Sequence, residues 1–200
     1  MTRIAFLRHG PTDWNAQSRI QGREDVGLSD EGLQLMESLR LPAPFDAARV
    51  FTSPLSRARA TAQAIMAPQP HEAEDSLIEM DWGQWSGETV GTLRERLGDA
   101  FLENEARGLD FRAEGGESPR DVMARLSGFA RKAAHLQEPV LAITHKGVIR
   151  AALAMGTGWD MKGRAPVKLA WRALHVFDAR NDGSLKLVEA NVMLKAAAAP

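Results

Sequence analysis

Residues 4–10 read Ile-Ala-Phe-Leu-Arg-His-Gly, and this stretch decides the fold. Four apolar residues follow one another without a break and end on Arg8-His9-Gly10. A short continuous apolar run is typical of a strand that is buried on both faces, as in a parallel sheet. The stretch therefore predicts a central strand whose carboxyl end carries an arginine, a histidine and a glycine.

The same order of residues occurs twice more. Residues 48–51, Ala-Arg-Val-Phe, precede Thr52-Ser53-Pro54-Leu55-Ser56-Arg57, and residues 139–143, Pro-Val-Leu-Ala-Ile, precede Thr144-His145-Lys146-Gly147. In parallel sheets, ligands bind just beyond the carboxyl ends of the strands. We therefore expect the three polar clusters to share one pocket, although His9 and His145 lie 136 positions apart.

Helical patterns separate these segments and supply the crossovers. A serine marks three of the expected helix starts: Ser29, Ser53 followed by proline, and Ser118 at the head of a capping box. Apolar stripes predict two further helices, over residues 89–105 and over residues 148–155.

The remaining segments complete the expected architecture. Residues 67–75 are expected to form a loop, Asn181-Asp182-Gly183 predicts a hairpin, and the tail from about residue 195 to residue 200 is expected to fray. With no repeat and no linker, the 200 residues are expected to form a single α/β domain. The predicted fold is a three-layer α/β/α sandwich with a mostly parallel central sheet.

Composition excludes several classes of function. Lys+Arg 25 against Asp+Glu 26 gives a net charge of −1, which argues against a nucleic-acid or anionic-membrane partner. The absence of cysteine excludes disulfides and thiolate metal sites. No apolar run approaches the ~20 residues of a membrane span, and Met1-Thr2-Arg3 does not begin a signal peptide. We therefore expect a cytoplasmic protein.

The strand-end clusters suit the chemistry of phosphate. Neutral imidazole is a nucleophile near pH 7, so His9 is a candidate for covalent catalysis. Arg8 and Arg57 offer planar forks of donors to phosphate oxygens, and His145 can complete an anion pocket. Each residue taken alone also has a structural explanation, but packing does not account for two histidines and two arginines at equivalent strand ends.

A tryptophan-rich loop supplies a candidate general acid. Glu79 and Asp81 both lie next to Trp82 and Trp85, and their chemistry alone does not separate them. A metal site is not expected, because Asp75 stands where the second histidine of a zinc helix is required after His71. The lack of any Gly-x-Gly-x-x-Gly leaves nucleotide cofactors without support, so no cofactor is expected.

In these residues the sequence resembles the histidine phosphatase superfamily, in its phosphoglycerate mutase-like branch. Four motifs match in order and together span residues 8–150. They are Arg8-His9-Gly10 with Thr12 and Asn15, Ser53-x-Leu55-x-Arg57-Ala58 with Thr61-Ala62, Leu77-x-Glu79 with Gly83, and His145-x-Gly147 with Ile149-Arg150.

The resemblance implies a role for each matched residue. His9 is the nucleophile that becomes phosphohistidine, without a metal. Glu79, and not Asp81, protonates the leaving oxygen and then activates water. The residues implied to bind the phosphoryl group are Arg8, Thr12, Asn15, Arg57 and His145.

Three functions use this set of residues. The leading hypothesis is a phosphomonoesterase that acts on a small phosphorylated metabolite, because only 27 residues separate Gly87 from Gly115 and the family's mutases carry longer insertions that exclude water. The alternatives are phosphoglycerate mutase-type transfer and a catalytically idle module that binds a phospho-ligand or a protein.

The sequence leaves the substrate and the oligomeric state open, and a dimer is compatible with it. Lys146 also departs from the family, which commonly has a small residue after the second histidine. It either adds a cation at the pocket rim or points to solvent.

Overall fold

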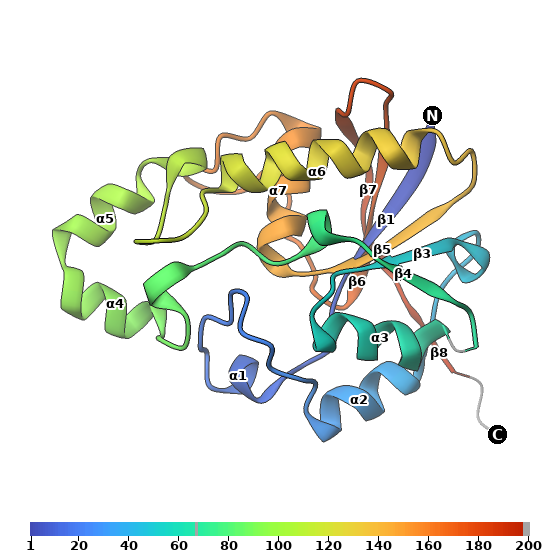
Figure 1. Cartoon of the computed structure of the whole chain (residues 1–200), viewed down its shortest axis with the longest axis horizontal. Helices are drawn as coiled ribbons and strands as arrows, with labels where there is room; N and C mark the ends of the chain where they lie inside the picture. Colours follow the sequence, from blue (N-terminus) through green and yellow to red (C-terminus); the bar gives the residue numbers. More distant parts are fainter. Residues whose placement is uncertain (67, 198–200) are drawn as a thin grey trace.

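A six-stranded sheet runs through the computed structural model, which describes residues 1–66 and 68–197 (Figure 1). Its strands are β1 (Thr2–Arg8), β3 (Arg49–Thr52), β4 (His71–Ala73), β5 (Val140–Thr144), β6 (Ala173–Ala179) and β7 (Leu185–Met193). The strand order is β4-β3-β5-β1-β6-β7. The four strands from β4 to β1 are parallel, whereas β6 and β7 are antiparallel. The mostly parallel sheet is as predicted.

Helices cover both faces of this sheet. They are α1 (Asp13–Ala16), α2 (Asp30–Glu37), α3 (Ser56–Met66), α4 (Val90–Leu97), α5 (Asp99–Glu105), α6 (Pro119–Ala134) and α7 (Lys146–Thr157). Single turns of 3-10 helix occur at η1 (Phe45–Ala47), η2 (Asp75–Leu77), η3 (Gly83–Trp85) and η4 (Gly108–Asp110). In Figure 1, α6 and α7 lie on one side of the sheet, α2 and α3 lie on the other, and α4 and α5 extend beyond its end. The predicted three-layer α/β/α sandwich is confirmed.

The first strand shows why its sequence is continuously apolar. Ile4 and Phe6 pack into the hydrophobic core beneath α6 and α7, and Ala5 and Leu7 pack into a second core beneath α3. Successive side chains of a strand point to opposite faces, so a strand between two helical layers needs apolar residues at every position.

Two of the three predicted serine caps are confirmed. The Ser29 hydroxyl accepts the N–H of Gly32 at 3.1 Å. Ser118 and Asp121 form the reciprocal capping box, in which the Asp121 carboxylate accepts the Ser118 N–H at 2.8 Å. The predicted hairpin at residues 181–183 connects β6 to β7.

Two helix predictions are wrong in part. The helix expected to begin after Ser53 begins at Ser56. The Ser53 hydroxyl accepts the N–H of Leu55 at 3.3 Å, before the first turn of the helix, and also contacts His145 at 2.7 Å. The single helix expected over residues 89–105 is split into α4 and α5 at Gly98, whose φ of 55° is incompatible with a right-handed helix.

Two segments expected to lack structure contain strands. Residues 71–73 of the expected loop form β4, which pairs in parallel with β3. Part of the tail expected to fray forms β8 (Lys195–Ala196), which pairs with β2 (Leu39–Arg40), while residues 198–200 lie outside the described residues. Both strands are short and polar, so their own residues carry no strand pattern. Each forms because a strand that is distant in sequence pairs with it.

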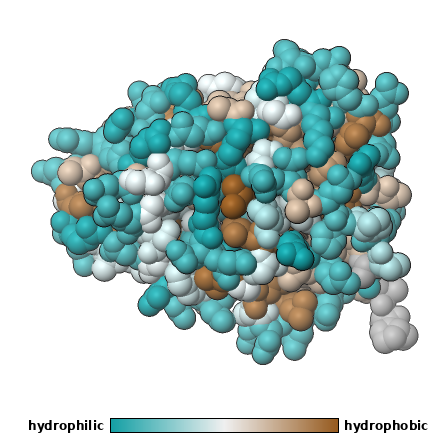
Figure 2. All heavy atoms as spheres, viewed as in Figure 1, coloured by the Kyte–Doolittle hydropathy of each residue, from teal (hydrophilic) through white to brown (hydrophobic). Residues whose placement is uncertain are grey.

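The surface in the view of Figure 2 is mainly hydrophilic, with hydrophobic side chains gathered in small separate groups. Across residues 1–66 and 68–197, no helix is both long and apolar enough to cross a bilayer.

Two helical glycines give a matched test of packing. A Cβ at Gly32 in α2 would collide with the backbone carbonyl of Pro11, whereas a Cβ at Gly128 in α6 would meet no atom within 4 Å. We expect Gly32→Ala to lower the free energy of unfolding by about 1–3 kcal/mol through overpacking. Gly128→Ala should raise it by about 0.5–1 kcal/mol, because alanine is the better helix former. Urea denaturation measures both, and shifts of the same sign would contradict the packing between α2 and residue 11.

Candidate active site

The carboxyl ends of β1 and β5 bring two distant histidines together. Arg8 pairs with Thr144 in the register of the two strands, and the His9 N–H donates to the Thr144 carbonyl at 2.9 Å. The imidazole centroids of His9 and His145 are consequently 5.1 Å apart. The expected meeting of these clusters at one edge of the sheet is therefore observed.

The hydrogen bond of His9 determines its tautomer. Its Nδ1 lies 2.7 Å from the carbonyl oxygen of Gly10. Because a carbonyl can only accept, Nδ1 carries the proton and Nε2 of the neutral ring keeps its lone pair. Burial, followed by the charges of Arg8 and Arg57, holds the pKa of His9 well below its ordinary value, which keeps the ring neutral.

Arg57 is completely buried in the first turn of α3. Its two terminal nitrogens donate to the backbone carbonyls of Glu24 at 2.7 Å and of Gly22 at 2.8 Å. Its Nε donates to Nδ1 of His145 at 3.3 Å. No carboxylate oxygen among the described residues lies within ion-pair distance of it, so the guanidinium is held by neutral groups and keeps its charge uncompensated by an ion pair.

His145 has the opposite tautomer to His9. Its Nδ1 accepts from Arg57, so its Nε2 carries the proton and donates to the Ser53 hydroxyl at 2.7 Å. Burial lowers the pKa of His145 well below the ordinary value, and His9 and the nearby arginines lower it further. The Ser53 hydroxyl therefore orients this ring.

The structure separates the two candidate acids. The Glu79 carboxylate accepts the N–H of the residue that follows it at 2.8 Å and the N–H of Gly147 at 3.1 Å. A Cβ at Gly147 would collide with this carboxylate, so the glycine permits the approach. Asp81 is occupied elsewhere, accepting the Gly83 N–H at 2.8 Å and pairing with Arg23 at 3.5 Å. Glu79 therefore lies against the backbone of Gly147, two residues after His145, whereas Asp81 is bonded to other groups.

Thr12 and Asn15 form a capping box at the start of α1. Each side-chain oxygen accepts the other residue's backbone N–H at 3.2 Å. Asn15 also lines a pocket of about 160 Å³ together with Arg8 and His9. The cap uses only the oxygen of the Asn15 amide, so its N–H donors are not needed for the turn. Thr12 does not line this pocket and holds Asn15 in place.

Two residues of the site were not assigned from the sequence. The Thr61 hydroxyl accepts the Gly10 N–H at 2.9 Å and donates to the Arg57 carbonyl at 2.7 Å, which ties two strand-end clusters together. The sequence feature that could have indicated Thr61 is its spacing of four residues from Arg57, which places both residues on one face of the helix. The Trp171 ring lies under the Arg8 guanidinium, at 5.6 Å from ring centroid to Cζ. No short motif pointed to Trp171.

The described part of the chain contains no group of three or more His, Asp or Glu side chains arranged to hold a metal ion.

Known proteins resemble this chain in sequence and in fold. The model of the histidine phosphatase superfamily (branch 1) matches residues 4–192. The chain is 30% identical over 168 residues to phosphoserine phosphatase 1 of Hydrogenobacter thermophilus, covering 80% of this chain and 79% of that protein. It is 33% identical over 133 residues to a 2,3-bisphosphoglycerate-dependent phosphoglycerate mutase of Methylobacterium radiotolerans, covering 62% of each.

A solved structure has the same architecture. YhfR of Bacillus stearothermophilus superimposes with a TM-score of 0.82 at 24% identity, covering 96% of this chain and 98% of that chain. The chain belongs to the histidine phosphatase superfamily and is a phosphoric monoester hydrolase.

Proposed function

We propose that this protein hydrolyses phosphomonoesters of small metabolites without a metal, through a phosphohistidine formed on Nε2 of His9. The observation that carries the proposal is the hydrogen bond from Nδ1 of His9 to the Gly10 carbonyl. That bond leaves Nε2 as the nucleophilic nitrogen in a pocket that Arg8 and Asn15 also line.

In the first step, Nε2 of His9 attacks phosphorus while the bond from phosphorus to the leaving oxygen breaks. Glu79, in its protonated form, transfers its proton to that oxygen, so the alcohol leaves neutral. Phosphoryl transfer depends mainly on positioning and charge neutralisation, which Arg8 and Arg57 supply.

In the second step, water attacks the phosphohistidine. The Glu79 carboxylate takes a proton from the water, the bond between phosphorus and Nε2 breaks, and inorganic phosphate leaves. His9 returns to its neutral form and Glu79 to its protonated form, so each group is ready for another cycle.

A bound phosphoryl group would also supply a hydrogen-bond partner to a buried nitrogen of the site. The Nε of Arg8 is buried without a hydrogen-bond partner among the described residues, and such a donor is costly to leave unpaired. A phosphoryl oxygen would satisfy it. A bound dianion would also favour the protonated form of His145, whose Nδ1 could donate to a second oxygen once the Arg57 Nε turns from Nδ1 to the phosphoryl group. Asn15 contributes the N–H donors of its amide.

Transfer to water is favoured over transfer between two substrates. The residues that line the His9 pocket come from residues 7–36 and 171–172, and none comes from the segment between Gly87 and Gly115. That segment forms α4 and α5, which pack around Trp85 and Phe101 beyond the sheet. It contributes no residue that would exclude water from that pocket.

Replacing His9 should abolish turnover. We expect His9→Ala to lower kcat/KM for p-nitrophenyl phosphate, measured with EDTA present, by on the order of 10³-fold or more, because the covalent step is lost. The matched control is His135→Ala, which removes an exposed imidazole at the end of α6 and should retain full activity.

Other outcomes point to other functions. Full activity in His9→Ala would refute the phosphohistidine. Interconversion of phosphoglycerates by the wild type, without release of inorganic phosphate, would indicate a mutase. Binding of vanadate without any turnover would indicate a phospho-ligand-binding module.

Replacing Glu79 should separate the two chemical steps. p-Nitrophenolate leaves without a proton, so Glu79→Gln should still release about one equivalent per enzyme in a rapid burst. Turnover should then slow by about 10²–10⁴-fold, because no general base activates water. Rapid-quench kinetics measures both phases. Asp81→Asn should lose far less activity than Glu79→Gln, and equal losses would reject the assignment of the acid.

In the free enzyme, His9 should stay neutral at pH values well below the pH at which a solvated histidine becomes protonated. Burial, Arg8 and Arg57 all disfavour the imidazolium, so they lower the pKa of His9 and extend the neutral range toward acid. Long-range ¹H–¹⁵N NMR at pH 6 should show His9 as the Nδ1–H tautomer, assigned by its loss in His9→Ala. In urea, the unfolded chain should titrate near the usual value of about 6.5. An imidazolium on His9 at pH 6 in the folded protein would contradict the site.

A further inference from the structure

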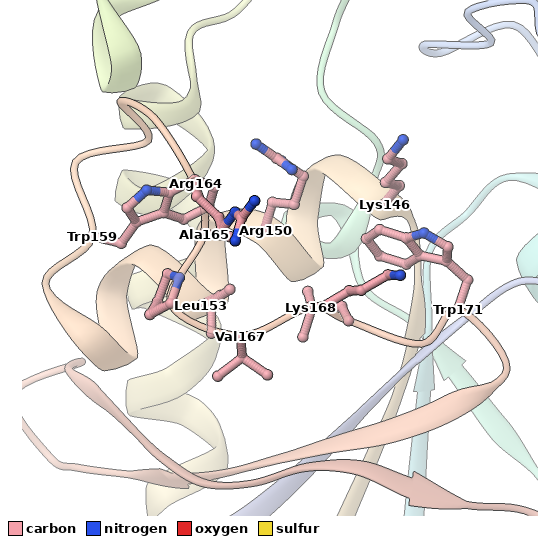
Figure 3. Close-up of a pocket in the computed structure, with 11 residues that line it drawn as sticks. Lys146, Arg150, Leu153, Trp159, Arg164, Ala165, Val167, Lys168 and Trp171 are labelled. Atoms are coloured by element: carbon pink, nitrogen blue, oxygen red, sulfur yellow. The ribbon is translucent and has the colours of Figure 1, made fainter.

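A second pocket, of about 680 Å³, lies between α7 and the loop that leads into β6 (Figure 3). Its lining includes four cationic side chains and two tryptophans, and no carboxylate. They are Lys146, Arg150, Arg164, Lys168, Trp159 and Trp171. We refer to this space as the cationic pocket.

The charge of the cationic pocket is not neutralised by the protein. Within the described part of the chain, none of its four cations forms an ion pair. Burial lowers the pKa of Arg150. Burial also lowers the pKa of Lys146, and the charges of Arg8 and Arg150 lower it further, opposed by the smaller effect of Glu79. An anion in this space would relieve both the repulsion and the desolvation.

The cationic pocket adjoins the pocket that contains His9. Trp171 lines both of them. The Arg8 Cζ lies 5.6 Å from the Trp171 ring centroid, and the Lys146 Nζ lies 5.5 Å from it. Lys146 also follows His145 directly in the chain. The two pockets therefore share the wall formed by Trp171, and the volume of the cationic pocket is typical of sites for small ligands.

The side chains of the cationic pocket are suited to an anion on a carbon skeleton. Arg150 lies over the Trp159 ring at 4.9 Å, which holds its planar fork in one orientation. Figure 3 shows Arg150 and Arg164 converging from α7 and from the loop, with Lys168 extending toward Trp171. Guanidinium groups bind carboxylates and phosphates in two-pronged geometry, and the indoles can pack against the carbon atoms between two charged groups.

We propose that the cationic pocket binds a second anionic group of the substrate while the phosphoryl group lies at His9. The substrates are then phosphomonoesters whose leaving group carries a carboxylate or a second phosphate. Lys146 is accordingly a cation at the pocket rim. This inference rests on the proposed phosphatase activity and names the substrate class of that activity.

Matched substrates test the inference on the intact protein. Glycerol 3-phosphate and 3-phosphoglycerate differ at one end, where a hydroxymethyl group is replaced by a carboxylate. Fructose 6-phosphate and fructose 1,6-bisphosphate test a second phosphate in the same way. We expect kcat/KM to be about tenfold or more higher for the acidic member of at least one pair, as charge-assisted contacts provide. The pair that shows the preference identifies the anion.

A matched pair of variants tests the location. Arg150→Gln with Lys168→Gln should remove most of the preference for the acidic substrate. Its kcat/KM for p-nitrophenyl phosphate, which has no second anion, should change by less than about twofold. The control is Arg180→Gln with Lys186→Gln, which removes the same charge at the far end of β6 and β7 and should keep the preference.

The outcomes separate the inference from the function on which it rests. Equal kcat/KM within both substrate pairs, with p-nitrophenyl phosphate still hydrolysed, would overturn the cationic pocket as a substrate site and leave the phosphatase intact. Equal loss of preference in both double variants would attribute it to net charge and also overturn the proposal. Failure to hydrolyse any of the esters would overturn the phosphatase itself.

Discussion

The guanidinium of Arg57 is completely buried at the start of α3, and a buried charge is costly unless other groups compensate for it. The carbonyls of Gly22 and Glu24 supply part of this compensation and thereby hold the loop after α1 against the sheet edge. Burial lowers the pKa of His9 and of His145 well below the ordinary value, and the charge of Arg57 lowers both further. The unliganded site is therefore a cationic cavity with neutral histidines, which a dianion would stabilise.

The fold was predictable where a local pattern and the tertiary structure require the same residues. The run at residues 4–7 is apolar at every position because both faces of β1 are buried, so the pattern alone identified a central strand. Prediction failed where a distant partner decides the outcome. Ser53 has the sequence of a helix cap, but its hydroxyl bonds to His145, and β4 forms because β3 offers it an edge. Nothing in residues 71–73 themselves indicates that strand.

The site was predictable to the extent that strand ends define it. His9 and His145 follow β1 and β5, whose parallel register brings any residues at those positions together. The choice of tautomer at His9 and the separation of Glu79 from Asp81 depend on where the fold places backbone groups, such as the Gly10 carbonyl and the Gly147 N–H, and a motif does not give these positions. Trp171 was missed for the same reason, since only the folded chain places its ring beneath Arg8.

The two pockets that share Trp171 are lined by different elements of the fold. This difference affects how substrate specificity can change while the reaction stays the same. The pocket of His9 includes residues at and just beyond the end of β1, where a hydrogen-bonded sheet leaves little freedom to move a side chain. The cationic pocket is lined by side chains of α7 and of the loop of residues 158–172. Loop residues of this kind can change without disturbing the sheet. The chemistry of phosphoryl transfer can thus stay constant while the cations opposite Trp171 select the group that accompanies the phosphate.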